Sequence, residues 1–343
     1  MGGPVDAVRH LLAVQSQDYP GAVWALGQRI GSGTAASIGT EFDDGAFIRT
    51  HVLRPTWHFV APEDLRWLVA LTAPRLIRGA AHRHRALGID ARLLVRAAGV
   101  FERQIAERGP QTRPELGAAL ARSGIEAEAG RLMHLIMWAE YEAILCSGPR
   151  KAKLQSYVLL EERVAPARPR EREEAIVEIA ARYVAGHGPV QDVDLAWWSG
   201  GSLGEARRGL QGAGDRLERT VMRDGRIFWS ADDGGARAAG ATGRSVHLLP
   251  NYDELLVAMR DRTDCAHPDL PEDARRPEHI FNDVIVVDGQ VVGEWDRPTP
   301  SGKPRLGLRP RVKLDAGTRA DVEAAANLYG RFIDRRLTVE WLD

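Results

Sequence analysis

The sequence is poor in cysteine, with only Cys146 and Cys265 among 343 residues. They stand far apart and neither has a second cysteine nearby, so neither a disulfide framework nor a thiolate zinc site is predicted. We expect both to be buried, unreactive thiols. The chain also has no apolar run near the ~18 residues that cross a bilayer, and no signal-peptide pattern at its start. We therefore expect a cytoplasmic protein without membrane contact.

Signature motifs of several enzyme classes are missing as well. The sequence has no phosphate-binding P-loop, no glycine-rich dinucleotide motif, no metal-binding triad and no serine nucleophile elbow. Their absence argues against nucleotide-dependent enzymes, dehydrogenases and serine hydrolases. We expect a protein that uses neither a metal nor a cofactor.

A positive net charge is also lacking. The formal net charge is −1, which argues against a wholly basic nucleic-acid binder, because neutralising phosphates requires clustered Lys and Arg. Acidic residues concentrate in 161–174, however, and basic residues gather in four short stretches: 78–85, 150–153, 216–226 and 305–313. This distribution is compatible with one basic face. The excess of Arg over Lys is equally explained by a GC-rich genome.

The chain is long enough for two to four packed units, and its order of elements repeats. Three times, a helix, a polar break and a second helix precede a strand-like stretch, which is the order of a winged helix-turn-helix. The units are predicted at 1–90, 91–165 and 166–235. From about residue 245 strands dominate, which predicts a small, barrel-like β domain with a terminal helix over 244–343. The expected fold class is α+β and mainly helical.

Local signals place the elements of the second and third units. A helix over 93–108 ends at Gly109-Pro110, and Thr112 with Glu115 forms a capping box for the next helix. In the third unit Ser202 and Glu205 repeat that box. The dipeptide Asp224-Gly225 is typical of a two-residue hairpin turn within a wing over 217–229.

The first unit and the C-terminal part follow from periodicity. In the first unit, helices are predicted over 5–14, 22–30 and 62–72, with a wing over 47–60; Pro20 should keep Tyr19 extended. After a connector over 231–243, strands are expected at 246–249, 280–287, 291–295 and 306–314, followed by a helix over 321–333.

Four phrases, in order along the chain, resemble the winged-helix DNA glycosylases of the AlkZ/YcaQ type: LLAVQSQDYPGAVWAL (11–26), LRPTWHFVAPEDLRWL (53–68), HGPVQDVDLAWWSG (187–200) and HLLPNYDELLVAMRDR (247–262). The resemblance implies three tandem winged-helix units and a small β domain around a concave surface that faces DNA. It also implies excision of bulky or crosslinked N-alkylpurines from duplex DNA by a nucleoid-associated monomer. Family members carry further residues ahead of the first phrase, so a truncated start is expected.

The family motif is Gln, a residue that is usually apolar, and then Gln or Asp. Here it is Gln15-Ser16-Gln17, so both glutamines match and the middle residue departs. The resemblance makes Gln15 and Gln17 the catalytic candidates. On a helix, residues two apart point to nearly opposite sides, so their amides converge only if the helix unwinds there. The alternative is that Gln15 caps backbone groups while Gln17 is solvated.

An amide does not accept a proton usefully, so the two glutamines cannot act as a general base. One carbonyl oxygen would stabilise an oxocarbenium-like sugar while the second amide positions water. This weak assistance suffices only when the leaving base is already cationic, as an N-alkylated purine is. The alternatives are a non-catalytic winged-helix DNA-binding regulator or lesion sensor, and a protein-interaction scaffold.

Seven further residues are candidates for DNA contact. Arg54 could reach a phosphate, although a surface arginine needs no function. His58 is as well explained by a core histidine, and Asp253 by a helix cap. The remaining candidates are arginines that could bind phosphate: Arg260, Arg262, Arg309 and Arg311. Arg260 and Arg262 also have possible ion-pair partners in Asp261 and Asp264.

Overall fold

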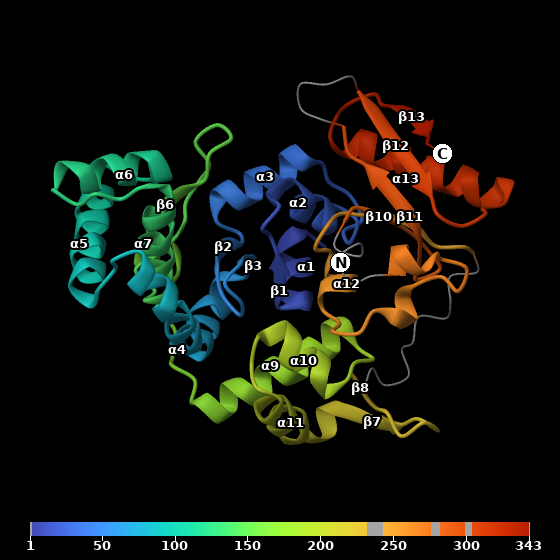
Figure 1. The fold of residues 1–343 in the computed structure, drawn as a ribbon, viewed down its shortest axis with the longest axis horizontal. Helices are drawn as coiled ribbons and strands as arrows, with labels where there is room; N and C mark the ends of the chain where they lie inside the picture. Colours follow the sequence, from blue (N-terminus) through green and yellow to red (C-terminus); the bar gives the residue numbers. More distant parts are fainter. Residues whose placement is uncertain (1, 232–242, 276–281, 299–303, 343) are drawn as a thin grey trace.

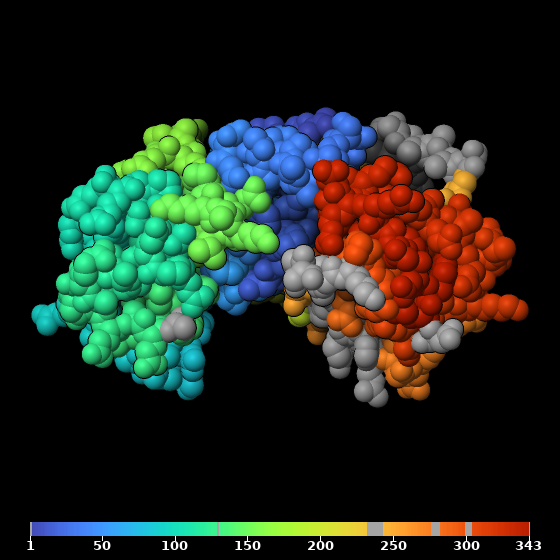
Figure 2. Space-filling model, turned by 90° about the horizontal axis from the view of Figure 1, so that it is seen from above, coloured from blue at the N-terminus to red at the C-terminus, as the bar shows by residue number. Residues whose placement is uncertain are grey.

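A computed structural model describes residues 2–231, 243–275, 282–298 and 304–342. The chain forms an arch, with residues 91–165 in one arm, the C-terminal sheet in the other and the first ninety residues between them (Figure 1). Figure 2 shows an open hollow between the two arms. Within the described ranges, no helix is long and apolar enough to cross a membrane.

The first ninety residues contain four helices and a small sheet: α1 (Pro4–Leu11), β1 (Ala13–Gln15), α2 (Tyr19–Gly27), α3 (Ala35–Asp44), β2 (Ile48–His51), β3 (Trp57–Val60) and α4 (Pro62–Ala86). The wing predicted over 47–60 is present as β2 and β3. The sheet has the order β1-β3-β2 and both of its pairings are antiparallel, so β1 is an edge strand.

Three predictions about this region are wrong. The first helix does not reach residue 14: it ends at Leu11, because Leu12 takes a left-handed φ of 65° and the chain continues as strand β1. The second helix begins at Tyr19 rather than 22, so Tyr19 is helical and not extended as predicted. Pro20 lies in its first turn, where a missing N–H costs no helical hydrogen bond.

Residues 91–165 form a separate helical group with its own sheet: α5 (Ala91–Arg108), β4 (Gln111–Thr112), α6 (Arg113–Arg122), α7 (Ala129–Tyr141), β5 (Leu145–Ser147), β6 (Ser156–Leu159) and α8 (Leu160–Arg163). The predicted capping box is confirmed, since the Thr112 backbone N–H donates to Glu115 Oε2 at 2.6 Å. The core of this group comes almost entirely from residues 89–157.

The third helical group comprises α9 (Arg172–His187), α10 (Asp192–Ser199), α11 (Leu203–Gly212) and the hairpin β7 (Leu217–Val221) and β8 (Ile227–Ala231). Ser202 caps α11 as predicted, accepting a hydrogen bond from the Glu205 backbone N–H at 3.1 Å. Asp224 and Gly225 lie in the turn between β7 and β8, as predicted. Most of the predicted connector over 231–243 lies outside the described residues.

The C-terminal part is an open sheet rather than a closed barrel in the residues that the structure describes. Its elements are β9 (Val246–Leu249), α12 (Glu254–Val257), β10 (Val284–Val287), β11 (Gln290–Asp296), β12 (Arg305–Pro310), α13 (Ala316–Phe332) and β13 (Thr338–Trp341). The strand order is β13-β12-β11-β10-β9. A helix after Asp253 was anticipated only through the possible cap, without bounds, and β13 was not predicted. Residues 280 and 281 of one predicted strand lie outside the described ranges.

The hydrophobic cores show how the parts join. One core combines Leu12, Val60 and Leu68 of the first ninety residues with Trp198 and other side chains of the third helical group. A second core combines α1, α2 and α3 with the C-terminal sheet and α13. Residues 1–90 are therefore the hub of the molecule, buried on two sides by segments that follow much later in the sequence.

Candidate functional site

The Gln15-Ser16-Gln17 segment is not helical: Gln15 is the last residue of strand β1, and the chain passes through Ser16 into a bend at Gln17. Gln15 lies opposite His58 in the antiparallel pairing of β1 with β3. The Ser16 backbone N–H donates to Trp57 O at 2.7 Å, and Gln17 Oε1 lies 3.4 Å from the Trp57 backbone N–H. Side chains alternate where the chain leaves the strand, so those of Gln15 and Ser16 point to opposite faces. Gln15 is 7 % exposed, whereas Gln17 is exposed to solvent.

Glu254, which the sequence analysis missed, lies behind this segment. Its side chain is fully buried at the start of α12. Oε1 accepts a hydrogen bond from the Gln15 backbone N–H at 2.7 Å, and Oε2 accepts one from the indole N–H of Trp198 at 2.9 Å. His187 Nε2 lies 3.3 Å from Oε2. One carboxylate thus connects strand β1, the third helical group and the C-terminal part.

The surroundings of Glu254 favour its ionised form. Burial alone would raise the pKa of this carboxyl, but the hydrogen bond and charge of His187, the N–H of Gln15 and the charge of Arg54 together hold it below the ordinary value. His187 Nδ1 lies 3.0 Å from Tyr183 O, which fixes the orientation of the ring. The site therefore contains a carboxylate that the motif itself did not indicate.

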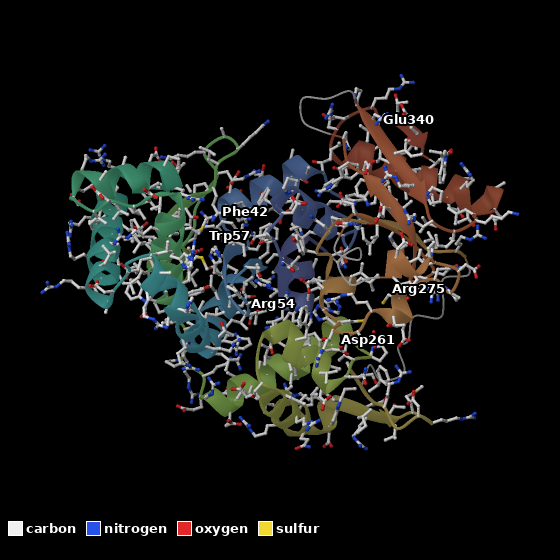
Figure 3. The ribbon with its side chains drawn as sticks, in the orientation of Figure 1. Phe42, Arg54, Trp57, Asp261, Arg275 and Glu340 are labelled. Carbon is white, nitrogen blue, oxygen red and sulfur yellow. The ribbon has the colours of Figure 1, made fainter. Side chains whose placement is uncertain are left out.

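Arg54 and His58 lie within electrostatic reach of this carboxylate. His58 is fully buried, and its Nδ1 lies 3.0 Å from Thr56 O. Burial and the charge of Arg54 lower the pKa of His58 to about 3, so the ring is neutral at physiological pH. Arg54 lies where residues 1–90 meet the third helical group (Figure 3). In this arrangement His58 offers DNA no exposed surface.

Asp253 and Arg262 are also interior residues. Asp253 is 1 % exposed; it caps α12 through the Leu255 N–H at 2.9 Å and forms a two-point ion pair with Arg29. Arg262 is 5 % exposed, and its Nε donates to Leu256 O at 2.7 Å. Its Nη1 donates to Arg260 O at 3.3 Å. Arg260 is exposed, as a phosphate-binding residue would need to be.

The arginines of the C-terminal sheet are already paired with acidic side chains. Arg309 lies 3.2 Å from Asp296, and Arg311 lies 3.0 Å from Asp273. Most of the predicted basic stretches contain such pairs. The stretch 78–85 on α4 differs, because its arginines form no ion pair within the described residues. Of the four basic stretches, 78–85 therefore has the least of its positive charge neutralised by acidic side chains.

Ser16 occupies the interior side of the motif. Its side chain is fully buried, and its hydroxyl has no hydrogen-bond partner among the residues that the structure describes. Arg49 holds the backbone at this point: Nε and Nη2 donate to Ser16 O at 3.0 and 2.6 Å, and the guanidinium stacks over Trp57 at 4.3 Å. Ser16 thus stands at a buried position where the family motif usually has an apolar residue.

Neither cysteine belongs to this site. Both are buried and unpaired with each other, as expected, and burial raises the pKa of the Cys146 thiol to about 12. In the described part of the chain, no group of three or more His, Cys, Asp or Glu side chains has the geometry of a metal site.

Comparisons with known proteins agree on one family. The family model "DNA glycosylase AlkZ-like" matches residues 8–332. A curated relative, the "Interstrand DNA cross-link repair glycosylase" of Streptomyces sahachiroi, is 22% identical over 309 residues, which cover 85% of this chain and 81% of that protein. The solved structure of Streptomyces sahachiroi DNA glycosylase AlkZ has a TM-score of 0.76 and 21% identity, covering 100% of this chain and 94% of that one. At this identity the structural likeness concerns the fold.

The unpaired Ser16 hydroxyl yields a stability prediction. Ser16→Ala should raise the free energy of unfolding by about 1 kcal/mol, because it removes a buried polar group that has no partner. Ser202→Ala, the same chemical change at the cap of α11, should lower it by about 1 kcal/mol. Urea denaturation of both variants checks the pair. A Ser16→Ala protein less stable than the wild type would show that the hydroxyl is satisfied in solution.

The buried histidine makes stability depend on pH. The pKa of His58 is about 3 in the folded chain and ~6.5 when unfolded, so the unfolded state takes up the proton first as pH falls. Above pH ~6.5 the free energy of unfolding is unaffected by the titration of His58. Between pH ~6.5 and pH ~3 it falls by up to about 1.4 kcal/mol per pH unit.

His58→Asn should therefore flatten the pH dependence of unfolding between pH 6 and 4, because its side chain has no proton to take up in that range. His82→Asn, at an exposed position of α4, is the control and should leave the slope unchanged. Urea midpoints measured across this range decide the question, and identical slopes for the wild type and His58→Asn would contradict the assignment.

Proposed function

The chain belongs to the AlkZ-like DNA glycosylase family, and on this premise we propose that it is a DNA repair enzyme that hydrolyses the N-glycosidic bond of cationic N-alkylated purines in duplex DNA. Bulky N7-alkylguanine and crosslinked purines are the proposed lesions, since the curated relative is named for repair of interstrand crosslinks. We propose that the protein acts as a monomer.

One observation carries this proposal: both glutamines lie along β3, Gln15 opposite His58 and Gln17 with its Oε1 3.4 Å from the Trp57 backbone N–H. This removes the difficulty that a helical motif would pose, because the chain is not helical at either glutamine and the two amides can approach one substrate. Gln15 is held in the interior and Gln17 is exposed beside it. An extruded nucleotide would meet Gln17 first, with Gln15 behind it.

The chemistry follows from what amides can do. As the glycosidic bond breaks, positive charge moves onto the sugar, and a fixed carbonyl dipole stabilises that charge. The second amide holds the attacking water. The purine leaves as a neutral base because its alkyl group already made it cationic, so no strong general acid is required. Glu254 adds a fixed negative charge behind the site without touching substrate.

DNA binding is proposed to rest on exposed basic residues rather than on the buried candidates. Arg260 is exposed, and the arginines of 78–85 have no ion-pair partner within the described residues. Arg309 and Arg311 would have to exchange their present acidic partners for phosphate. Because binding releases counterions, affinity should decline steeply with salt.

Excision of N7-alkylguanine from a duplex oligonucleotide, measured as released base under single-turnover conditions, tests the function. Gln15→Ala and Gln17→Ala should each raise the barrier by about 2–4 kcal/mol, roughly 30-fold to 900-fold in rate, while DNA affinity and melting temperature stay nearly unchanged. Gln17→Asp should retain excision, because a carboxylate also stabilises the cation.

Gln211→Ala, on the exposed side of α11, is the matched control and should excise at the wild-type rate. Equal rates in the wild type and both motif variants would remove the catalytic proposal. Duplex binding without any base release would favour the regulator or lesion sensor instead.

A further inference from the structure

Several buried polar atoms beside Gln15 lack a protein partner. Within the described residues, no hydrogen bond reaches Gln15 Oε1, His58 Nε2, or Nε and Nη2 of Arg54. A buried polar atom without a partner costs about 1–3 kcal/mol, and a charged one costs more. The two acceptors, Gln15 Oε1 and His58 Nε2, and the donors of Arg54 therefore need a partner that the protein itself does not supply.

Gln15 and His58 face one another, and Arg54 lies within electrostatic reach of His58. Gln15 and His58 are directly opposite in the β1–β3 pairing, so their side chains share a face of the sheet with Cβ atoms about 5 Å apart. Arg54 enters from the loop between β2 and β3, where Leu53 takes a left-handed φ of 63°. The charge of Arg54 lowers the pKa of both His58 and Glu254, so its guanidinium lies within electrostatic reach of both.

Arg54 is directed inward rather than toward a DNA phosphate. Its nitrogens Nε and Nη2 are both buried. The aliphatic part of the side chain packs against Gly200, at the end of α10: a Cβ added to Gly200 would lie 3.4 Å from Arg54 Cγ. Figure 3 places Arg54 at this junction. These two donors of its guanidinium therefore serve the interior of the site.

The hydrogen-bonding character of the cluster is complementary to one water molecule. His58 Nδ1 lies against Thr56 O, which can only accept, so Nδ1 carries the proton and Nε2 of the neutral ring is an acceptor. Gln15 Oε1 also accepts, whereas a guanidinium only donates. A water that accepts from Arg54 and donates to Gln15 Oε1 and His58 Nε2 satisfies all three, as buried waters in proteins typically do.

We propose that Arg54 is a positioning residue for Gln15, acting through a buried water that it shares with His58. This arrangement turns the carbonyl of Gln15 inward and presents its amide N–H groups to the substrate. The carbonyl that faces the sugar cation is then that of Gln17. The inference rests on the proposed function and assigns a different role to each glutamine.

A double-mutant cycle tests this coupling. The variants are Arg54→Met, Gln15→Ala and the double variant, compared by single-turnover excision rate at saturating protein and by urea midpoint without DNA. Arg54→Met should lower the rate about tenfold or more in the wild-type background with DNA affinity unchanged. In the Gln15→Ala background the same change should alter the rate less than about twofold, because its target is gone. The midpoint shifts should be non-additive as well.

Arg75→Met is the matched control. Arg75 is a half-buried arginine at the same junction, donating to Leu53 O and Ser199 O at 2.9 and 2.8 Å, but no contact links it to Gln15 within the described residues. Its effects on the urea midpoint should add to those of Gln15→Ala.

Three results decide between the readings. Additive effects of Arg54→Met and Gln15→Ala in both assays would overturn the proposal. Lost DNA affinity with an unchanged rate at saturation would also overturn it, because Arg54 would then bind phosphate. If no variant, wild type included, releases a base, the proposed function fails, and the urea midpoints alone decide: non-additivity still supports the Arg54–Gln15 coupling, and additivity overturns it.

Discussion

The structure around the glutamine motif depends on one buried carboxylate. Glu254 accepts the backbone N–H of Gln15 and the indole N–H of Trp198, and it lies beside His187. A buried carboxylate is tolerated only when its partners repay several kcal/mol of lost hydration. Because the partners come from different parts of the chain, separating those parts leaves a charge or a donor unpaired. The interaction therefore ties the edge of strand β1 to two other regions.

The same pattern recurs around the motif. Arg29 joins α2 to Asp253, the residue before Glu254, and Arg297 of the C-terminal part pairs with both Asp18 and Asp283. Arg49 fixes the carbonyl of Ser16 from within the first ninety residues. The backbone around the motif, at the edge of the small sheet, is thus fixed by contacts from several parts of the chain. This rigidity matters if weak dipoles are to act, because a dipole stabilises a developing charge only when it is already oriented.

Local features of the fold could be predicted from the sequence, whereas the setting of the site could not. The capping boxes at Thr112 and Ser202 and the turn at Asp224-Gly225 depend on neighbours within a few residues, and all three are present. The motif was found through its resemblance to a family, and its amides were expected to converge only where the helix unwinds. The first helix was predicted to reach residue 14, however, and the pairing with β3 that makes residues 13–15 a strand was not predicted.

Glu254 could not have been found by spacing, because its partner Gln15 lies 239 residues away. The same distance explains why Asp253, His58 and Arg262 looked like candidates for DNA contact: their burial is decided by segments that no local pattern reveals. Arg309 and Arg311 looked available because their acidic partners belong to other strands and turns.

Amide hydrogen exchange at Gln15 tests most directly whether Glu254 closes this strand edge. An N–H on the outer side of an edge strand normally exchanges quickly, whereas that of Ser16, bonded to Trp57 O, should be protected. If Glu254 holds the Gln15 N–H in solution, both amides should exchange at the same slow rate, set by global unfolding. Fast exchange at Gln15 beside slow exchange at Ser16 would contradict the account.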